Sequence, residues 1–250
     1  MASILALHAH PDDIETLCAG TLAILAGAGH RVVLATATAG ECGSASTDLA
    51  ATGRIRRAEA AAAAALIGAS YLCAELPDLC VYNTDPARRA VTEVVRQAAC
   101  EIVITAAVAD YHPDHEAVSI LVRDACFAAS APNFQTGPAE PLAAIPHLYF
   151  ADPIGGRDRD GARVEPDFAV DITETLGIKV AMLAAHESQA VWLKKQHDID
   201  DAAASMKAFG ARQGRDFGVA YAEGFRQYAH HPYPRDGLLQ RLVGEALLVR

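Results

Sequence analysis

The sequence has no long apolar run and little positive charge, and each absence argues against a class of protein. No apolar stretch in the 250 residues reaches the roughly 18 residues that a transmembrane helix needs. Lys and Arg number 21 against 31 Asp and Glu, so the formal charge is −10. Nucleic acids and anionic membranes bind clustered positive charge, so neither is expected as a partner.

Paired cysteines and a leader segment are also missing. None of the six cysteines forms a CxxC pair, and a chain of this length does not depend on disulfides. No basic segment precedes the polar residues that begin at His8, so we expect no cleaved signal peptide. The simplest prediction is a reduced, cytoplasmic protein. With 52% hydrophobic residues, residues 1–250 can form one large domain.

Short apolar segments alternate with helical segments along the chain. We expect strands at 4–8, 32–36, 71–73, 102–105, 147–150 and 168–172. We expect helices at 17–28, 54–66, 86–100, 116–129, 174–187, 198–213 and 238–248. This alternation implies parallel βαβ units, and strands without polar alternation have helices on both faces. The predicted fold is therefore α/β and Rossmann-like, a mostly parallel sheet flanked by helices in a single domain.

The densest polar cluster follows the first predicted strand. Residues 8–15 read His-Ala-His-Pro-Asp-Asp-Ile-Glu, with two imidazoles and three carboxylates. Adjacent carboxylates repel one another unless a cation is present. The spacing of His10 and Asp13 lets both face one metal ion from a turn, which leaves Asp12 free to act as a base. The plainer alternative is a solvated loop with an aspartate that caps the next helix.

A second cluster, Asp-Tyr-His-Pro-Asp-His at residues 110–115, follows the predicted strand 102–105. The carboxyl ends of parallel strands share one edge of a sheet, where α/β proteins bind ligands. Together the clusters supply a histidine, a carboxylate and a second histidine, with one coordination position open. This donor set is typical of catalytic zinc. Taken alone, the second cluster also fits a pair of surface histidines near a helix start.

These two clusters resemble the LmbE-like (PIG-L) family of zinc-dependent N-deacetylases, in which His-Pro-Asp-Asp and His-Pro-Asp-His motifs follow two strands. Weaker similarities extend over most of the chain. They are Thr38-Ala39-Gly40-Glu41, Arg56-Arg57-Ala58-Glu59, Leu76-Pro77-Asp78, His186-Glu187-Ser188-Gln189 and Ala222-Glu223-Gly224-Phe225. Departures at positions 14, 17, 19 and 39 concern substrate contacts more than catalysis, because the metal set is intact.

The resemblance implies a role for each residue of the clusters. Asp12 resembles the general base, and His112 the residue that stabilises the oxyanion or protonates the leaving amine. Asp114 resembles a carboxylate that orients a histidine. The residues that resemble the three zinc ligands are His10, Asp13 and His115.

The expected reaction removes an N-acetyl group from an amino sugar or an N-acetylglucosaminyl conjugate by means of metal-activated water. Zinc lowers the pKa of the water toward about 7, and Asp12 removes its proton. The metal and a protonated His112 then stabilise the oxyanion. Candidate substrate contacts are Arg56, Glu41 and Tyr111, although a solvated helix start, loop polarity and a buried structural tyrosine explain them as well.

Several alternatives remain open at this point. The same zinc site is compatible with a hydratase of an unsaturated dicarboxylic acid, or with an amidase of a thiol–sugar conjugate. A metal-dependent sugar-binding module is disfavoured, because a protein that only binds sugar does not need the spare carboxylate of Asp12. The apolar predicted tail helix is a candidate contact in a homo-oligomer. Outside the clusters, we expect a core position for His8, a surface position for His186 and a packing role for Trp192.

Overall fold

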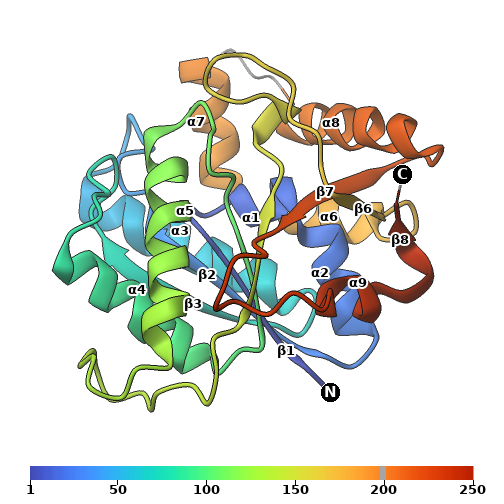
Figure 1. Ribbon diagram of the computed structural model, residues 1–250. Helices are drawn as coiled ribbons and strands as arrows, with labels where there is room; N and C mark the ends of the chain where they lie inside the picture. Colours follow the sequence, from blue (N-terminus) through green and yellow to red (C-terminus); the bar gives the residue numbers. More distant parts are fainter. Residues whose placement is uncertain (198–200, 250) are drawn as a thin grey trace.

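The strands form one eight-stranded mixed sheet, in the order β3-β2-β1-β4-β5-β7-β6-β8 (Figure 1). The computed structural model describes residues 1–197 and 201–249. Within these residues, the four pairs from β3 to β5 are parallel and the three pairs from β5 to β8 are antiparallel. The predicted α/β class with a mostly parallel sheet is therefore confirmed.

Helices lie on both faces of the sheet (Figure 1). The strands are β1 (Ser3–His8), β2 (Arg31–Thr38), β3 (Ser70–Leu76), β4 (Ile102–Thr105), β5 (His147–Ala151), β6 (Phe168–Asp171), β7 (Ala222–Gln227) and β8 (Leu247–Leu248). The α-helices are α1 (Asp13–Leu17), α2 (Ala19–Gly27), α3 (Leu49–Ala65), α4 (Asp85–Ala98), α5 (Pro113–Ala129), α6 (Leu176–Ala184), α7 (Glu187–His197), α8 (Ala202–Phe217) and α9 (Leu238–Val243). Single 3-10 turns, η1 (Ile154–Gly156) and η2 (Gly244–Ala246), complete the set.

Alternate residues of the parallel strands point into two apolar cores. Ile4 and Ala6 of β1 pack in the core that contains residues of α2 and α6. Leu5 and Leu7 pack in the other core, with α4 and α5. All four side chains are fully buried. Because both faces are covered, the central positions of the strands are apolar on both sides, as in residues 4–7 of β1 and 32–35 of β2.

The predicted strands of the first half are confirmed, but two helices differ from prediction. The predicted helix 17–28 is divided into α1 and α2, because the backbone of Cys18 leaves helical geometry at a φ of −143°. The helix predicted at 54–66 begins earlier, as α3. Its start is fixed by the carboxylate of Asp48, which accepts a hydrogen bond of 2.7 Å from the backbone N–H of Ala51.

The helices after β6 differ more from prediction. The predicted helix 174–187 consists of α6 and the first residue of α7, and the rest of α7 is not predicted. The predicted helix 198–213 begins outside the described residues and corresponds to α8, which continues to Phe217. The predicted tail helix 238–248 is only half helical. Gly244, with a φ of 56°, follows α9, and Leu247–Leu248 then pair with β6 as β8.

Strand β7 is not predicted, because its sequence Ala-Glu-Gly-Phe-Arg-Gln combines charges with a glycine. Contacts distant in sequence form it. It pairs with β5 on one side and β6 on the other, and Phe225 is fully buried. Gly224 is required there because a Cβ at this position would lie 2.3 Å from Oδ2 of Asp152.

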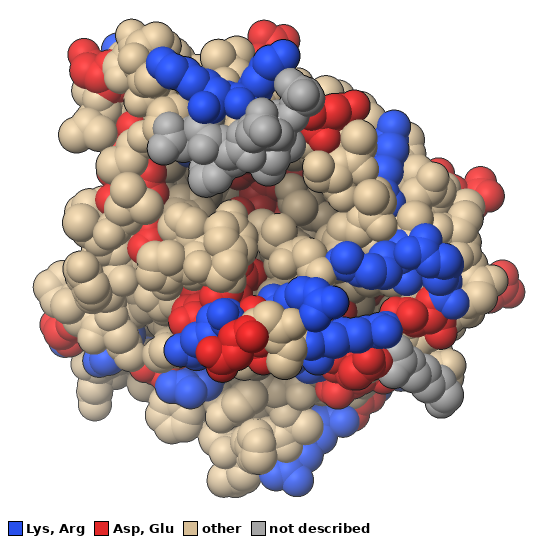
Figure 2. Space-filling view, turned by 90° about the horizontal axis from the view of Figure 1, so that it is seen from above, with Lys and Arg blue, Asp and Glu red and all other residues tan. Residues whose placement is uncertain are grey.

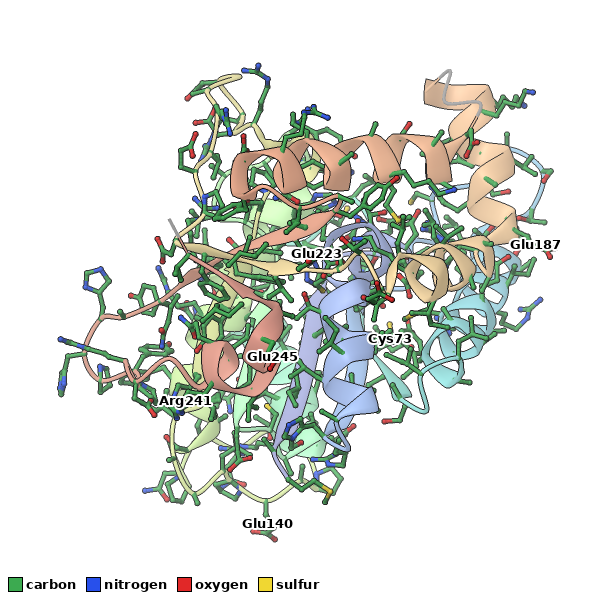
Figure 3. All side chains as sticks on the ribbon, turned by 90° about the vertical axis from the view of Figure 1, so that its right-hand side faces the viewer. Cys73, Glu140, Glu187, Glu223, Arg241 and Glu245 are labelled. Atoms are coloured by element: carbon green, nitrogen blue, oxygen red, sulfur yellow. The ribbon has the colours of Figure 1, made fainter. Side chains whose placement is uncertain are left out.

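A buried carboxylate ties β7 to the start of α2. Glu223 accepts hydrogen bonds from the backbone N–H groups of Gly20 at 2.9 Å and Thr21 at 2.7 Å. Nζ of Lys179 in α6 lies 2.5 Å from the same carboxylate. Figure 3 shows Glu223 in the interior, whereas Glu140 extends from a surface loop. The contact complements the helix dipole and ties the start of α2 to β7 and α6.

No helix of the described part of the chain has the length and apolar character to cross a bilayer.

Candidate active site and metal centre

Two neighbouring strands bring the predicted clusters together. β1 and β4 pair in parallel, with Leu7 opposite Thr105 at their carboxyl ends. The chain after β1 turns into α1, and the chain after β4 leads to His112, which caps α5. The shared edge of the sheet thus brings the first cluster beside the second, as expected for parallel strands.

The carboxylate of Asp13 lies between two imidazoles. Its Oδ2 is 3.4 Å from Nδ1 of His10, and its Oδ1 is 3.3 Å from Nε2 of His115. All three side chains are buried. Ring nitrogens of His10, His112 and His115 also lie within 4.8 Å of one another. These donors fit one ion such as zinc, which takes imidazole nitrogen and carboxylate oxygen as ligands.

Further carboxylates face the outer nitrogens of the same two rings. Nε2 of His10 is 3.2 Å from Oδ1 of Asp78 and 3.4 Å from Oδ2 of Asp114. Nδ1 of His115 is 3.2 Å from Oδ1 of Asp110. Carboxylates in this position fix the orientation of metal-binding imidazoles and make them more basic. We expected this position for Asp114. The sequence assigned no such role to Asp78 and Asp110, although both belong to the segments singled out there.

The excess of carboxylates shifts the titration of the metal-ligand candidates. Burial opposes charge on His10, but Asp114, Asp13 and Asp78 outweigh it and hold its pKa well above the usual value. For His115, burial is outweighed by Asp13 and Asp110, which raise its pKa to about 9. Burial likewise opposes ionisation of Asp13, yet His115 and His10 hold its pKa well below the usual value. The pocket therefore demands positive charge, which a divalent cation supplies.

Asp12 is the partly buried carboxylate beside this set. Its backbone has a φ of 98°, a strained conformation that aspartate tolerates better than most residues. Burial raises the pKa of Asp12 to about 6, against the opposing effect of Arg56. Nη2 of Arg56 is 3.5 Å from Oδ1 of Asp12. The side chain therefore carries a carboxylate of raised basicity at the edge of the candidate metal site.

His112 combines a structural and a chemical position. Its Nδ1 accepts a hydrogen bond of 3.2 Å from the backbone N–H of Asp114, which caps α5. An accepting Nδ1 places the proton of the neutral ring on Nε2. Burial, together with His10 and His115, lowers the pKa of His112. The neutral ring therefore has a donor at Nε2.

The three candidate substrate contacts lie in different settings. Arg56 is buried, and its guanidinium donates 2.7 Å hydrogen bonds to the carbonyls of Gly40 and Pro11. Glu41 turns toward the backbone, where its Oε1 accepts a hydrogen bond of 2.9 Å from the N–H of Asp78. Tyr111 is 63% exposed, on the cavity wall. Their role in substrate binding stays a prediction.

A cavity of about 760 Å³ opens above the site. Its floor holds the two clusters, and its walls are mostly apolar. They include Leu79, Ile154, Trp192, Leu193, Met206 and Phe209. Figure 2 looks onto this face from above and shows a hollow with red carboxylates inside it and blue Lys and Arg side chains at the surface around it. The volume lies in the upper part of the range of roughly 300–1,000 Å³ for small-molecule sites.

Two histidines lie in the interior near the site. Burial lowers the pKa of His8 to about 4, so this histidine is a neutral core residue, as expected. The predicted surface position of His186 is wrong: it is 2% exposed, with Nε2 3.4 Å from Oε1 of buried Glu15. Trp192, for which we expected only packing, lines the cavity. The motif around His186 could be recognised in the sequence. The burial of His186 could not, because it depends on contacts with residues that are distant along the chain.

Comparison with known proteins gives one family. Residues 5–126 match the model of the PIG-L family, described as GlcNAc-PI de-N-acetylase. The conserved protein TT1542 from Thermus thermophilus is similar with 28% identity and a TM-score of 0.75, over 94% of this chain and 100% of that one.

Two further structures share the fold. The N,N'-diacetylchitobiose deacetylase from Pyrococcus horikoshii has 22% identity and a TM-score of 0.74, over 94% of this chain and 88% of its own. The 4-carboxy-2-hydroxymuconate hydratase from Pseudomonas putida has 23% identity and a TM-score of 0.73, over 94% of this chain and 99% of its own. The matched residues 5–126 contain both histidine clusters, so the resemblance of this part of the chain to the PIG-L (LmbE-like) family is confirmed.

Proposed function

We propose that this protein is a zinc-dependent N-deacetylase that hydrolyses the N-acetyl group of an amino sugar or of an N-acetylglucosaminyl conjugate. The observation that carries the proposal is the position of Asp13 between His10 and His115, with the spare, partly buried carboxylate of Asp12 beside it. The family's description as a de-N-acetylase and the fold shared with a deacetylase support it.

In this proposal His10, Asp13 and His115 hold the metal ion. When bound, the ion supplies Lewis-acid activation of a water molecule and of the amide carbonyl. Asp78, Asp110 and Asp114 hold the two ligating rings through their outer nitrogens.

Asp12 acts as the general base in this account. Its raised pKa makes it a better proton acceptor than an exposed aspartate, and the Arg56 contact holds it toward the cavity. The proton that Asp12 takes from water is then available for the leaving amine. His112 donates a hydrogen bond from Nε2 to the developing oxyanion. The neutral imidazole can make this hydrogen bond, so the mechanism does not need the protonated imidazole that we expected from the sequence.

A hydratase is the second candidate, because the fold is shared with the Pseudomonas putida enzyme. Addition of water to a double bond needs the same activated water but no leaving amine. The two candidates differ in product: a deacetylase releases acetate, whereas a hydratase removes the conjugated absorbance of an unsaturated dicarboxylic acid. An amidase of a thiol–sugar conjugate would release an amine without requiring acetate as the acid.

The test is acetate release from a panel of N-acetylated amino sugars by zinc-loaded and metal-stripped protein. We expect release from at least one member by the loaded protein, and loss of release after stripping. Absence of acetate release from every member, with zinc confirmed in the protein, contradicts the deacetylase proposal. Loss of conjugated absorbance with a dicarboxylic substrate would then favour the hydratase.

A further inference from the structure

Two arginines line the cavity from one face of α8. Arg212 and Arg215 are three residues apart, so both guanidiniums project from the same side of the helix. The carboxylates that line the cavity belong to its floor: Asp12, Asp13 and Asp78. The cavity therefore has an acidic, histidine-rich end and a separate basic wall.

The contacts of these arginines leave their charge available. Arg212 donates a hydrogen bond to the carbonyl of Gly155, and its guanidinium carbon lies 5.2 Å from the ring centroid of Phe209. Neither contact neutralises the cation. Among the described residues, no carboxylate oxygen lies within 4 Å of the guanidinium nitrogens of Arg212 or Arg215. Arg163, by contrast, is paired with Glu165 and Asp216 on the same side of the molecule.

A smaller hollow extends the cavity at Arg212. It has a volume of about 130 Å³ and shares Gly155, Phe209 and Arg212 with the main cavity. Arg212 thus borders both spaces. Asp152 and Asp216 also line this hollow, and within the described part of the chain the buried Oδ1 of Asp152 has no hydrogen-bond partner. The combined space exceeds what a single acetamido sugar at the metal end would fill.

We propose that Arg212 and Arg215 form an oxyanion subsite that binds a carboxylate or phosphate on the part of the substrate distal to its N-acyl group. The proposal rests on the proposed function and specifies its substrate class, an N-acylated amino sugar whose aglycone is anionic. Guanidinium groups match the planar oxygens of both anions. The apolar wall formed by Trp192, Met206 and Phe209 lies along the same cavity and suits the linking part of the substrate.

The net charge of the chain strengthens this assignment. The formal charge of −10 repels anions from most of the surface. A pair of unneutralised arginines on the cavity wall reverses the local field there, and so attracts an anionic substrate to the open end while the amide reaches the metal end. The attraction is expected to weaken as salt is added.

The test compares substrates that differ only in the aglycone: methyl N-acetylglucosaminide, N-acetylglucosamine 1-phosphate and carboxymethyl N-acetylglucosaminide. For the metal-loaded wild type we expect kcat/KM for an anionic member to exceed that for the methyl glycoside by about tenfold or more. The Arg212→Gln/Arg215→Gln variant should lose this preference and keep its activity on the methyl glycoside. The matched control is Lys207→Gln, an exposed cation on α8 that does not line the cavity. The phosphate and carboxymethyl arms identify which anion is preferred.

A binding measurement separates this proposal from the proposed function. Calorimetric titration of metal-stripped protein with the phosphate and the methyl glycoside needs no turnover. We expect tighter binding of the phosphate, lost in the double variant and kept in Lys207→Gln. If binding shows this pattern while loaded protein releases no acetate, the deacetylase proposal fails and the subsite stands. The subsite is overturned if neither assay shows a preference for an anion that depends on the arginines.

Discussion

Asp12 and Asp13 are adjacent in sequence but differ in environment. Asp13 lies between two imidazoles, which hold its pKa well below the usual value despite burial. Asp12 has one cationic neighbour at 3.5 Å and a burial cost that raises its pKa to about 6. Pairs of titratable groups whose environments separate their pKa values in this way are typical of sites that need a ligand and a base.

The Asp12→Asn variant tests this division of roles. It should retain metal binding but lose about 10²–10⁴-fold in kcat, because an amide cannot accept a proton. The measurement is acetate release alongside metal content. Glu140→Gln, on an exposed loop, is the control and should behave like wild type. Full turnover by Asp12→Asn would remove Asp12 from the mechanism.

Asp110 faces the proposed ligand His115, and its carboxylate also accepts hydrogen bonds from the backbone N–H groups of His112 and Ile154. Replacement by Asn leaves the ring but weakens the acceptor at its Nδ1, which lies 3.2 Å away. We expect the affinity for zinc to fall by about 10–100-fold, measured by competition with a chromogenic chelator. Asp160→Asn, on the exposed loop between β5 and β6, should leave it unchanged. Equal affinities of Asp110→Asn and wild type would show that this carboxylate does not support the site.

At the scale of elements, the Glu223 contact links the two halves of the sheet. Glu223 on β7 reaches the start of α2 and Lys179 of α6, far from it in sequence. Glu223→Gln should cost about 3–5 kcal/mol of unfolding free energy, because Lys179 is left buried without its partner. Glu245→Gln, an exposed residue near the C-terminus, is the control in denaturant unfolding.

A second substitution tests whether the buried charge of Lys179 causes the loss of stability in Glu223→Gln. In Glu223→Gln/Lys179→Met no buried ammonium remains, so the double variant should lose less than the sum of the two single losses. Additive losses would mean that the pair is not coupled, and would place the stability of this region in the apolar packing of α2 and α6.

The sequence predicts some helices and strands better than others. The strands of the parallel half have largely apolar sequences, and both histidine clusters follow such strands, so the fold class and the meeting of the clusters could be predicted. Strand β7 could not, because pairing with β5 and β6 rather than local sequence makes it a strand. The buried pair of Glu15 and His186 was missed for the same reason. The resemblance supplied the roles of the site residues, and these stay predictions.

At the scale of the whole molecule, the many carboxylates in one pocket make the free energy of unfolding depend on pH and on metal binding. Because the pKa of His115 is about 9 in the folded chain against 6.5 unfolded, its protonation stabilises the metal-free fold fully below pH 6.5. That contribution, of the order of 3 kcal/mol, is lost as pH rises through about 9.

Unfolding of metal-stripped protein by denaturant at several pH values measures this linkage. Stability should fall between pH 6.5 and 9, and saturating zinc should reduce the fall, because the ion replaces the protons. His230→Gln, an exposed histidine, should not alter the profile. A metal-free protein whose stability is constant or rises over this interval would contradict the charge balance described here.

The most direct test of the central claim is titration of zinc into stripped protein, with metal content and acetate release followed in the same samples. The account predicts that release from an N-acetylated amino sugar rises with zinc and saturates at one ion per chain. The same titration of His115→Gln should give neither tight binding nor release. Release that is independent of zinc, or one tightly bound zinc per chain with no hydrolysis of any N-acetylated sugar, would contradict it.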